Sequence, residues 1–224
     1  MNENYILALE TATNLCSVCL ANRDIPLIEH TIYIPNITDQ MLAQIVKRIV
    51  DETNLTFDQL CAVAVSSGPG SFTGLRIGAA FAKGLCFDNK IKLVPVPTLS
   101  AMAFACLKFA QLIKPERIIV VLPSHKDIYY YQFFDTDGNE TSNVNLGTLD
   151  ELRAIVRNND FLYSSSPVDI PVANKLEIRN YLTAKHIAQF GWNLYTSGMT
   201  TSPADFVPQY HQQFKPKVKD KRIL

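Results

Sequence analysis

The sequence predicts an α/β fold built as two successive lobes, because short strands and amphipathic helices follow one another in an order that starts twice. Three β-rich runs separated by turn residues, YILALETA, NLCSVCLA and PLIEHTIYI, favour an antiparallel meander at the start of the chain. Helices and strands then alternate, and a second meander starts near Arg117 with RIIVVL and DIYYYQFFD. With 224 residues, 47% of them hydrophobic, the chain can bury the core that two lobes need.

The first helix is predicted from Thr38 to about Thr53. Thr38 is a candidate N-cap, and Asp39 lies where a negative charge favours the positive end of a helix. Apolar residues recur at the i, i+3, i+4 spacing of one helix face, at Met41, Leu42, Ile45, Val46, Ile49 and Val50. This segment is therefore an amphipathic helix with one apolar face.

A glycine-rich stretch, SSGPGSFTGLRIGAAFAKGLCF, joins the next strand, CAVAVSS, to a second helix. Thr73 is placed to cap this helix, which we expect to run to about Phe87. KLVPV is another short strand, and Thr98 is placed to cap the helix LSAMAFACLKFAQLI. The step from Lys114 to Pro115 ends that helix, because the residue before a proline avoids helical backbone angles.

The order of three strands, helix, strand, helix, strand and helix is the layout of the ribonuclease H-like fold, and two such lobes in tandem make an actin-like (ASKHA) architecture. From Thr148 the pattern weakens: DELRAIVRNN and KHIAQFGWNL favour helices and FLYSS favours a strand, so we expect a degenerate second lobe. We expect the first lobe over residues 1–97, a smaller second lobe over 98–214 and a basic tail over 215–224. Such a tail is more often a solubilising end than a contact for nucleic-acid phosphates.

Composition narrows the classes of function. The 21 basic and 21 acidic residues cancel, so no whole-molecule field draws the protein toward nucleic acid or an anionic membrane. The first residues lack a signal-peptide pattern, and no window approaches the roughly 20 apolar residues of a membrane span, so we expect a cytoplasmic protein without membrane contact. The five cysteines favour packing roles over a metal site, because Cys16-x-x-Cys19 lacks a second pair.

The first hairpin, ETATNLC, is a candidate site for a nucleotide or anion. Glu10 is placed to hold a magnesium ion through water, and the hydroxyl groups of Thr11 and Thr13 could donate to a phosphate oxygen. The hairpin contains no glycine, so the Cβ atoms hinder close approach of the backbone to an anion. This composition argues against independent phosphate binding.

The loop GPGSFTG is the second candidate for an anion site. Gly68 and Gly70 flank a proline, which favours a fixed turn, and Ser71 and Thr73 bring hydroxyl groups to the start of a helix. A helix N-terminus of this kind can bind anions. The loop lacks the Gly-Lys-Ser/Thr ending of a P-loop, so the lysine that would reach the outer phosphates is missing.

The helix after this loop carries a stripe of small residues. Gly74, Gly78 and Ala82 recur every four residues and therefore lie on one face. Each glycine inside a helix costs about 1 kcal/mol relative to alanine, so close packing of a neighbour must offset the cost. Spacing alone favours an internal neighbour over a partner chain.

Taken in order, ILALETAT, SSGPGSFTGLRIGAAFAKGL and VPVPTLSAMA resemble the bacterial TsaB family, also called YeaZ. The strong match covers about the first 105 residues. The resemblance implies an actin-like fold and a role in making threonylcarbamoyladenosine, the modified adenosine beside the anticodon of certain tRNAs. It also implies a non-catalytic subunit that pairs with TsaD, the metal-binding catalytic paralogue, and works with the ATPase TsaE, so that tRNA is reached through the complex.

The resemblance also implies where partners bind. The family pairs through the two helices of its first lobe, which favours a partner contact for the small-residue stripe and self-association when the partner is absent. The implied interface residues are Met41, Leu42, Ile45, Ile49, Gly74, Gly78 and Ala82. No catalytic residue, metal ligand or intrinsic cofactor is expected, and ATP or ADP with Mg²⁺ at the subunit interface is left open.

Two departures from the family pattern stand out. Glu10 replaces the aspartate with which family members usually begin this motif, and LPSHKDIYY stands where many relatives carry an Asp-Ala-Arg turn.

Two other functions compete with the subunit role. The fold alone would permit an ATPase or a small-molecule kinase. A peptidase is the weaker alternative, because neither a metal-ligand pair nor a Ser-His-Asp order is evident.

Overall fold

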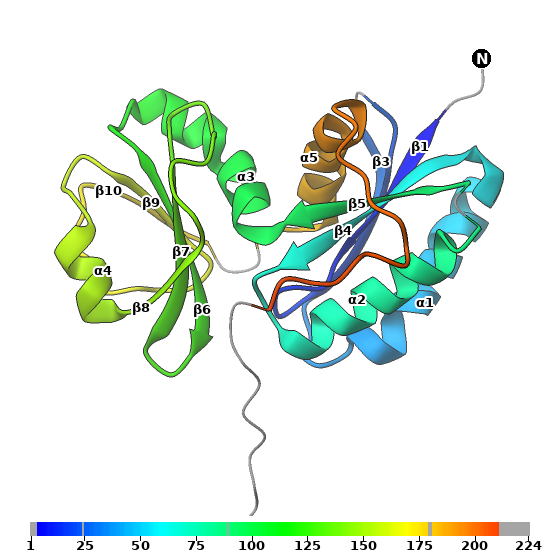
Figure 1. The fold of residues 1–224 in the computed structure, drawn as a ribbon, viewed down its shortest axis with the longest axis horizontal. Coiled ribbons are helices and arrows are strands. Elements are labelled where there is room, and N and C mark those ends of the chain that lie inside the picture. Colours follow the sequence, from blue (N-terminus) through cyan, green and yellow to red (C-terminus); the bar gives the residue numbers. More distant parts are fainter. Residues whose placement is uncertain (1–3, 24, 89, 179–180, 211–224) are drawn as a thin grey trace, which may run out of the picture.

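Two five-stranded sheets stand side by side in the computed structural model, which describes residues 4–23, 25–88, 90–178 and 181–210 (Figure 1). The first sheet contains β1 (Tyr5–Glu10), β2 (Cys16–Ala21), β3 (Pro26–Ile32), β4 (Leu60–Gly68) and β5 (Lys92–Pro97). The second contains β6 (Ile118–His125), β7 (Ile128–Phe134), β8 (Asn145–Thr148), β9 (Phe161–Ser164) and β10 (Asn174–Glu177). The helices are α1 (Thr38–Thr53), α2 (Phe72–Leu85), α3 (Thr98–Ile113), α4 (Leu149–Ile155) and α5 (Ala184–Thr196), with a 3₁₀ turn at Phe57–Gln59.

Both sheets have the same strand plan. The first has the order β3-β2-β1-β4-β5, in which β1 is antiparallel to β2 and parallel to β4. The second has the order β8-β7-β6-β9-β10, in which β6 is antiparallel to β7 and parallel to β9. This repetition confirms the predicted α/β fold of two ribonuclease H-like lobes. The second lobe is reduced, since its fourth and fifth strands are joined without a helix among the described residues.

Alternation along β1 and β4 builds a separate core on each face of the first sheet. Leu7 and Val63 point to the face that α1 and α2 cover. Ile6 and Ala62 point to the opposite face, toward α3 and α5. Successive side chains of a strand alternate between faces, so a strand covered on both sides needs apolar residues at nearly every position. This requirement explains the continuous apolar runs in the sequence.

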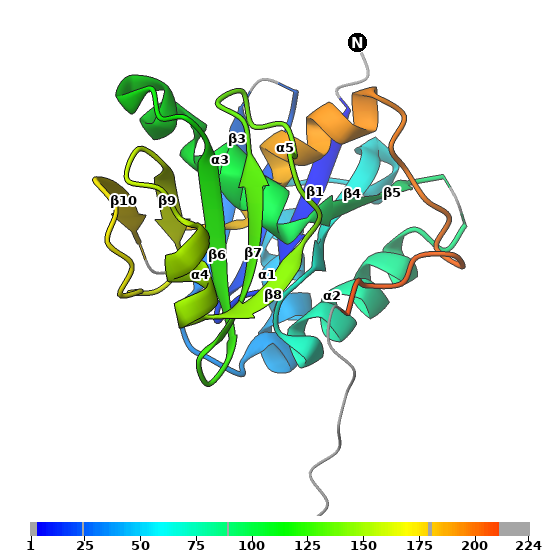
Figure 2. The same ribbon diagram turned by 60° about the vertical axis from the view of Figure 1, so that its left-hand side comes forward.

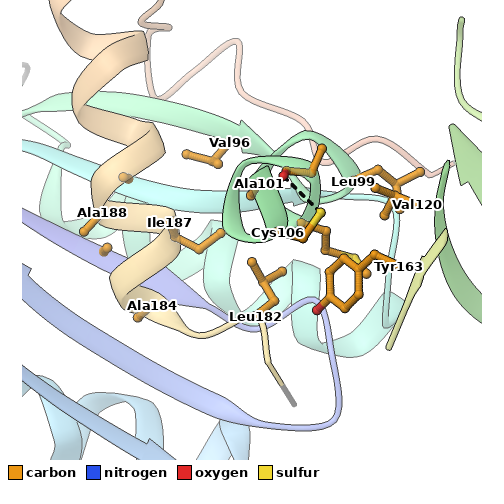
Figure 3. Packing of buried hydrophobic residues seen from close by; sticks show 14 of the residues in the cluster. Val96, Leu99, Ala101, Cys106, Val120, Tyr163, Leu182, Ala184, Ile187 and Ala188 are labelled. Carbon is orange, nitrogen blue, oxygen red and sulfur yellow. Dashed lines mark hydrogen bonds between the residues drawn. The ribbon is translucent and has the colours of Figure 1, made fainter. Parts of the chain in front are cut away.

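The helices α3 and α5 lie between the two sheets and join the lobes into one core (Figure 1). The close-up in Figure 3 shows Val96 of the first sheet and Tyr163 of the second on either side of Cys106 of α3, and Leu99 of α3 next to Val120 of the second sheet. Although α5 follows the strands of the second lobe in sequence, it packs on β1 and β2 of the first sheet. The division at residue 97 stays a proposal, because α5 belongs by position in the chain to one lobe and by contact to the other.

Three helix starts differ from the predicted caps. The first residue outside α1 is Ile37, and that outside α3 is Pro97, so Thr38 and Thr98 are the first residues inside their helices. Ser71, two residues before Thr73, caps α2. A sequence pattern places a helix end only to within a residue or two, because several polar residues near the end can serve as the cap.

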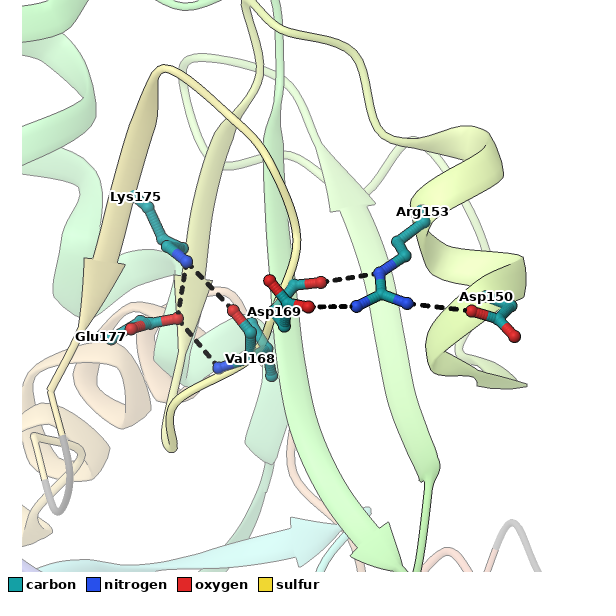
Figure 4. A network of polar contacts seen from close by, with 6 residues as sticks. All are labelled: Asp150, Arg153, Val168, Asp169, Lys175 and Glu177. Atoms are coloured by element: carbon teal, nitrogen blue, oxygen red, sulfur yellow. Dashed lines mark hydrogen bonds and ion pairs between the residues drawn. The ribbon is translucent and has the colours of Figure 1, made fainter.

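Polar contacts hold the outer part of the second lobe (Figure 4). Arg153 of α4 donates from Nε to the carbonyl oxygen of Asp169 at 2.8 Å and pairs with the carboxylates of Asp150 and Asp169. Lys175 Nζ lies 3.0 Å from Glu177 Oε1, which also accepts the N–H of Val168 at 2.9 Å. These pairs are partly or fully solvated, so each adds little to stability and together they fix the loop before β10.

The second view shows α1 and α2 next to one another, and both pack on the same face of the first sheet (Figure 2). Within the described part of the chain, no helix combines the length and the apolar character that crossing a membrane would require. The predicted basic tail, residues 215–224, lies outside the described residues.

Candidate functional site: first hairpin, interlobe cleft and partner helices

The first hairpin is held together by the carboxylate of Glu10 at the end of β1. Glu10 Oε1 accepts the backbone N–H groups of Ala12 and Thr13, both at 2.9 Å, and the Thr13 hydroxyl group at 3.1 Å. The third N–H of the turn, from Thr11, donates to Ser66 Oγ on β4 at 3.1 Å. Three backbone N–H groups of the hairpin are therefore bonded within the chain.

Glu10 is fully buried beneath the hairpin. Burial raises the pKa of its carboxyl group from an ordinary value of 4.5 to about 7, against hydrogen bonds from the hairpin that lower it. Its second oxygen, Oε2, and the buried hydroxyl group of Thr11 have no hydrogen-bond partner among the described residues. Glu10 thus changes protonation near neutral pH in a place where one of its oxygens is unbonded.

The glycine-rich loop is hydrogen-bonded to the hairpin. Ser71 N–H donates to the carbonyl oxygen of Ala12 at 2.7 Å, and Ser71 Oγ accepts the N–H of Gly74 at 3.2 Å. A Cβ atom on Gly70 would lie 2.4 Å from the same Ala12 oxygen, so only glycine fits this close approach. The loop and the hairpin therefore form one locked unit.

The small-residue stripe of α2 faces this hairpin. A Cβ atom on Gly74 would lie 2.0 Å from the carbonyl oxygen of Thr11, and one on Gly78 would lie 2.3 Å from Thr11 Oγ1. Ala82 is fully buried in the core between α2 and the sheet. The chain's own hairpin and sheet cover these three residues, and a partner contact at the stripe stays a prediction.

The apolar face of α1 is also internal. Leu42, Ile45 and Ile49 are at most 4% exposed and pack against the first sheet. The sheet covers the face on which these three residues lie, and a partner contact through them stays a prediction as well. Met41 is partly buried at the edge of the same core, so a partner contact for Met41 stays a prediction.

The outer surface of the two helices is made by neighbouring residues. On α2, Ala80 and Gly84 are exposed, Ile77 and Phe81 are half-buried beside them, and Phe87 beyond the helix end is 83% exposed. We call this set the α2 outer face. A Cβ atom on Gly84 would meet nothing within 4 Å, so the surface there is flat.

The adjoining outer surface of α1 is charged. Lys47 pairs with Asp51 at 2.5 Å and Arg48 pairs with Glu52 at 2.7 Å, both along the helix. His30 on β3 contacts Glu52 at 2.7 Å. The charged surface of α1 thus extends toward the edge strand β3, whereas α2 packs on β4 and β1.

A cleft of about 840 Å³ separates the hairpin and the glycine-rich loop from the second lobe. Of the predicted nucleotide or anion residues it is lined by Thr13, Gly70 and Ser71, whereas Glu10, Thr11, Gly68 and Thr73 lie outside its lining. Its other polar lining residues are Asn14, Ser124, His125, Ser165, Ser166, Gln209 and several tyrosines. Among the described residues that line the cleft, none is Lys, Arg, Asp or Glu.

The hairpin and the cleft do not fit a nucleoside triphosphate held as in an ATPase. The amide donors of the hairpin are taken by Glu10 and Ser66, and the lining offers neither a lysine for phosphate nor a carboxylate for a cation. Sequence reasoning gave no role in this region to Ser66, Gln209 or Tyr210, although Ser66 begins the glycine-rich stretch and PQY, residues 208–210, echoes a closing motif of the TsaB family.

The two repeated sheets with a cleft between them define an actin-like (ASKHA) protein, and comparisons with known proteins narrow the class. The family model described as TsaD, tRNA N6-adenosine threonylcarbamoyltransferase, matches residues 38–201. The chain belongs to this family, and its similarity to relatives named TsaB assigns it to the TsaB (YeaZ) group. The resemblance inferred from the sequence is thereby confirmed.

Individual relatives and solved structures resemble this chain to different extents. The tRNA threonylcarbamoyladenosine biosynthesis protein TsaB of Haemophilus influenzae is 32% identical over 138 residues, which cover 58% of this chain and 54% of that protein. The structure of YeaZ from Pseudomonas aeruginosa matches with a TM-score of 0.76 and 20% identity, over 92% of this chain and 99% of that one. The activator of 2-hydroxyisocaproyl-CoA dehydratase from Clostridium difficile, solved with bound ADPNP, shares the fold with a TM-score of 0.51 and 10% identity, over 87% and 96%. The chain spans about half the length of the curated relatives it matches.

Proposed function

We propose that this chain is a non-catalytic subunit for threonylcarbamoylation of the adenosine next to the anticodon of tRNA. In this proposal it pairs with the catalytic TsaD paralogue, works with the ATPase TsaE in the cytoplasm, and reaches tRNA through the complex. Family membership and the names of the relatives support the pathway. The consumption of the hairpin donors by Glu10 and Ser66 supports a role without catalysis.

The α2 outer face is the observation that carries the partner proposal. Ile77 and Phe81 are large apolar residues left half-exposed, and the small residues Ala80 and Gly84 beside them give a flat surface. Interfaces gain most of their free energy from a few large apolar or aromatic residues that a partner desolvates completely. The same face would support self-association when the partner is absent, because two-fold pairing uses one surface twice.

An experiment on the exposed side of α2 tests the partner proposal. Ala80→Arg adds a bulky charge to the α2 outer face without touching the core, and Ala154→Arg on α4 is a matched control, since both alanines are exposed on helices. We expect Ala80→Arg to weaken association with TsaD from the same host at least tenfold in sedimentation velocity, and Ala154→Arg to leave it unchanged. Equal association of the two variants would refute the interface.

A second measurement tests the pathway. Depletion of the chain in its host, followed by mass spectrometry of digested bulk tRNA, should abolish threonylcarbamoyladenosine. Complementation with Ala154→Arg should restore the nucleoside, and complementation with Ala80→Arg should restore less of it. An unchanged level after depletion, or ATP turnover by the purified chain alone, would contradict the proposed function.

A further inference from the structure

The chain returns after α5 to the start of α2 through a short segment, residues 206–210, which we call the strap. Figure 1 shows this orange-red segment crossing in front of β4 and β5 and ending at the first turn of α2. Phe206 anchors the strap, since it is 4% exposed within the core formed by α1, α2 and the first sheet. Pro208 is also buried, whereas Val207 is 64% exposed.

The strap contacts the glycine-rich loop on its backbone. Gln209 N–H donates to the carbonyl oxygen of Ser67 at 2.8 Å. Gly68, which follows Ser67, has a φ of +109°, and a Cβ atom there would lie 2.5 Å from the Gln209 carbonyl oxygen. Gly68 is thus required both by its backbone conformation and by the closeness of the strap.

The strap also contacts the first residue of α2. The ring of Tyr210 lies against the ring of Phe72, with centroids 4.9 Å apart, and the Arg76 guanidinium lies 5.3 Å from the same Phe72 ring. Both Gln209 and Tyr210 line the interlobe cleft, as Ser71 and Phe72 do. The strap therefore holds the end of β4 and the start of α2 from the same side.

We propose that Gln209 and Tyr210 are positioning residues that fix the first turn of α2 and so present the α2 outer face in the geometry a partner needs. Gly68 at the end of β4 and Gly70 in the loop before α2 leave the backbone there freer than other residues would. Contacts from the strap restrict that freedom before a partner binds, and restraint in the bound geometry strengthens association. The inference rests on the proposed function for the use of α2 as the partner helix.

Amide hydrogen exchange tests the restraint without any partner. Tyr210→Ala removes the ring contact, Gln209→Pro removes the N–H donor, and Val207→Ala is the control in an exposed position of the same segment. We expect several-fold faster exchange in residues 72–77 for the first two variants, and wild-type exchange for Val207→Ala and for Tyr210→Phe, which keeps the ring. Unchanged exchange in Tyr210→Ala and Gln209→Pro would overturn the inference.

Association with TsaD from the same host tests the second part of the proposal, that the strap presents the α2 outer face to a partner. Loss of an aromatic contact should weaken binding about 2- to 10-fold in Tyr210→Ala, with Tyr210→Phe close to wild type. Faster exchange with unchanged affinity would refute the coupling of the strap to the partner surface. If Ala80→Arg leaves binding intact, the proposed interface fails instead, and the exchange data still decide whether the strap restrains α2.

Discussion

The backbone N–H of Lys185 donates to the carboxylate of Glu29 at 2.7 Å, which joins the first turn of α5 to the edge strand β3 of the first sheet. The neighbouring N–H, from Ala184, donates to Ser17 Oγ on β2 at 3.0 Å. A carboxylate is favoured at the positive end of a helix, and these bonds satisfy two of its free N–H groups. Residues of the first lobe thus cap α5, the helix that follows the strands of the second lobe in the sequence.

Glu29→Ala should therefore destabilise the protein. Loss of a charged acceptor at a helix start costs roughly 1–2 kcal/mol, and Glu29→Gln should recover part of that cost because its amide oxygen can still accept. Urea unfolding followed by circular dichroism measures the difference. Identical midpoints for Glu29→Ala and the wild type would show that the cap contributes nothing to stability.

Substitution by alanine should destabilise the folded protein at Gly74 and stabilise it at Gly84. Gly74→Ala places a Cβ atom 2.0 Å from the carbonyl oxygen of Thr11, so we expect a loss of about 1–3 kcal/mol from overpacking. Gly84→Ala meets nothing within 4 Å and should stabilise by about 0.5–1 kcal/mol through helix propensity. Thermal unfolding of both variants checks the pair, and a stabilising Gly74→Ala would contradict the close contact with the hairpin.

The buried carboxyl group of Glu10 predicts a pH dependence of stability. Its pKa is about 7 in the folded protein and 4.5 when unperturbed, so the folded state holds the proton more tightly. The stabilising contribution of neutral Glu10 is complete below pH 4.5 and is lost as the pH rises through 7. Glu10→Gln keeps an acceptor oxygen but does not titrate.

The free energy of unfolding of Glu10→Gln should accordingly rise relative to the wild type between pH 4.5 and 8, by roughly 3 kcal/mol at most. Denaturant titrations of both proteins across this range measure the difference. Parallel curves for the two proteins would show that Glu10 does not change its protonation with unfolding.

Gly191 allows α5 to approach the first sheet. A Cβ atom there would lie 2.7 Å from the Cβ atom of Ala64 on β4. Gly191→Ala should destabilise although alanine is the better helix former, and Ala64→Gly should relieve the clash in the double variant. A double-mutant cycle measures this coupling, and strictly additive effects would mean that the two residues do not touch.

The sequence was sufficient for the strand plan and for most helices, because periodicities of 2 and 3.6 residues reflect which faces are buried. It was not sufficient to say what buries them. Leu42, Ile45 and Ile49 form an apolar face whichever body covers it, a sheet or a partner, and here it is the sheet. The need for a close neighbour at Gly74 and Gly78 was correctly inferred, but its identity as Thr11 depends on contacts between distant parts of the chain.

The hairpin was recognised as a candidate site from its residue types, but the role of its carboxylate was misjudged. Residue types indicated a carboxylate and two hydroxyl groups near an anion site, whereas the geometry directs the Glu10 carboxylate onto the hairpin itself. One methylene more than aspartate determines how far that carboxylate reaches, and spacing in sequence carries no information on such reach. The strap was missed because its partners lie 142 and 138 residues earlier, Ser67 for Gln209 and Phe72 for Tyr210.

The hairpin that Glu10 closes determines how the stability of the folded protein responds to nucleotides. A ligand stabilises a folded protein only if it binds the folded state, in proportion to its free concentration. The Glu10 carboxylate and the Ser66 hydroxyl group accept three N–H groups of the hairpin, so these groups are not available to a phosphate of ATP or ADP. Added ATP or ADP should then leave the thermal unfolding temperature of the purified chain unchanged.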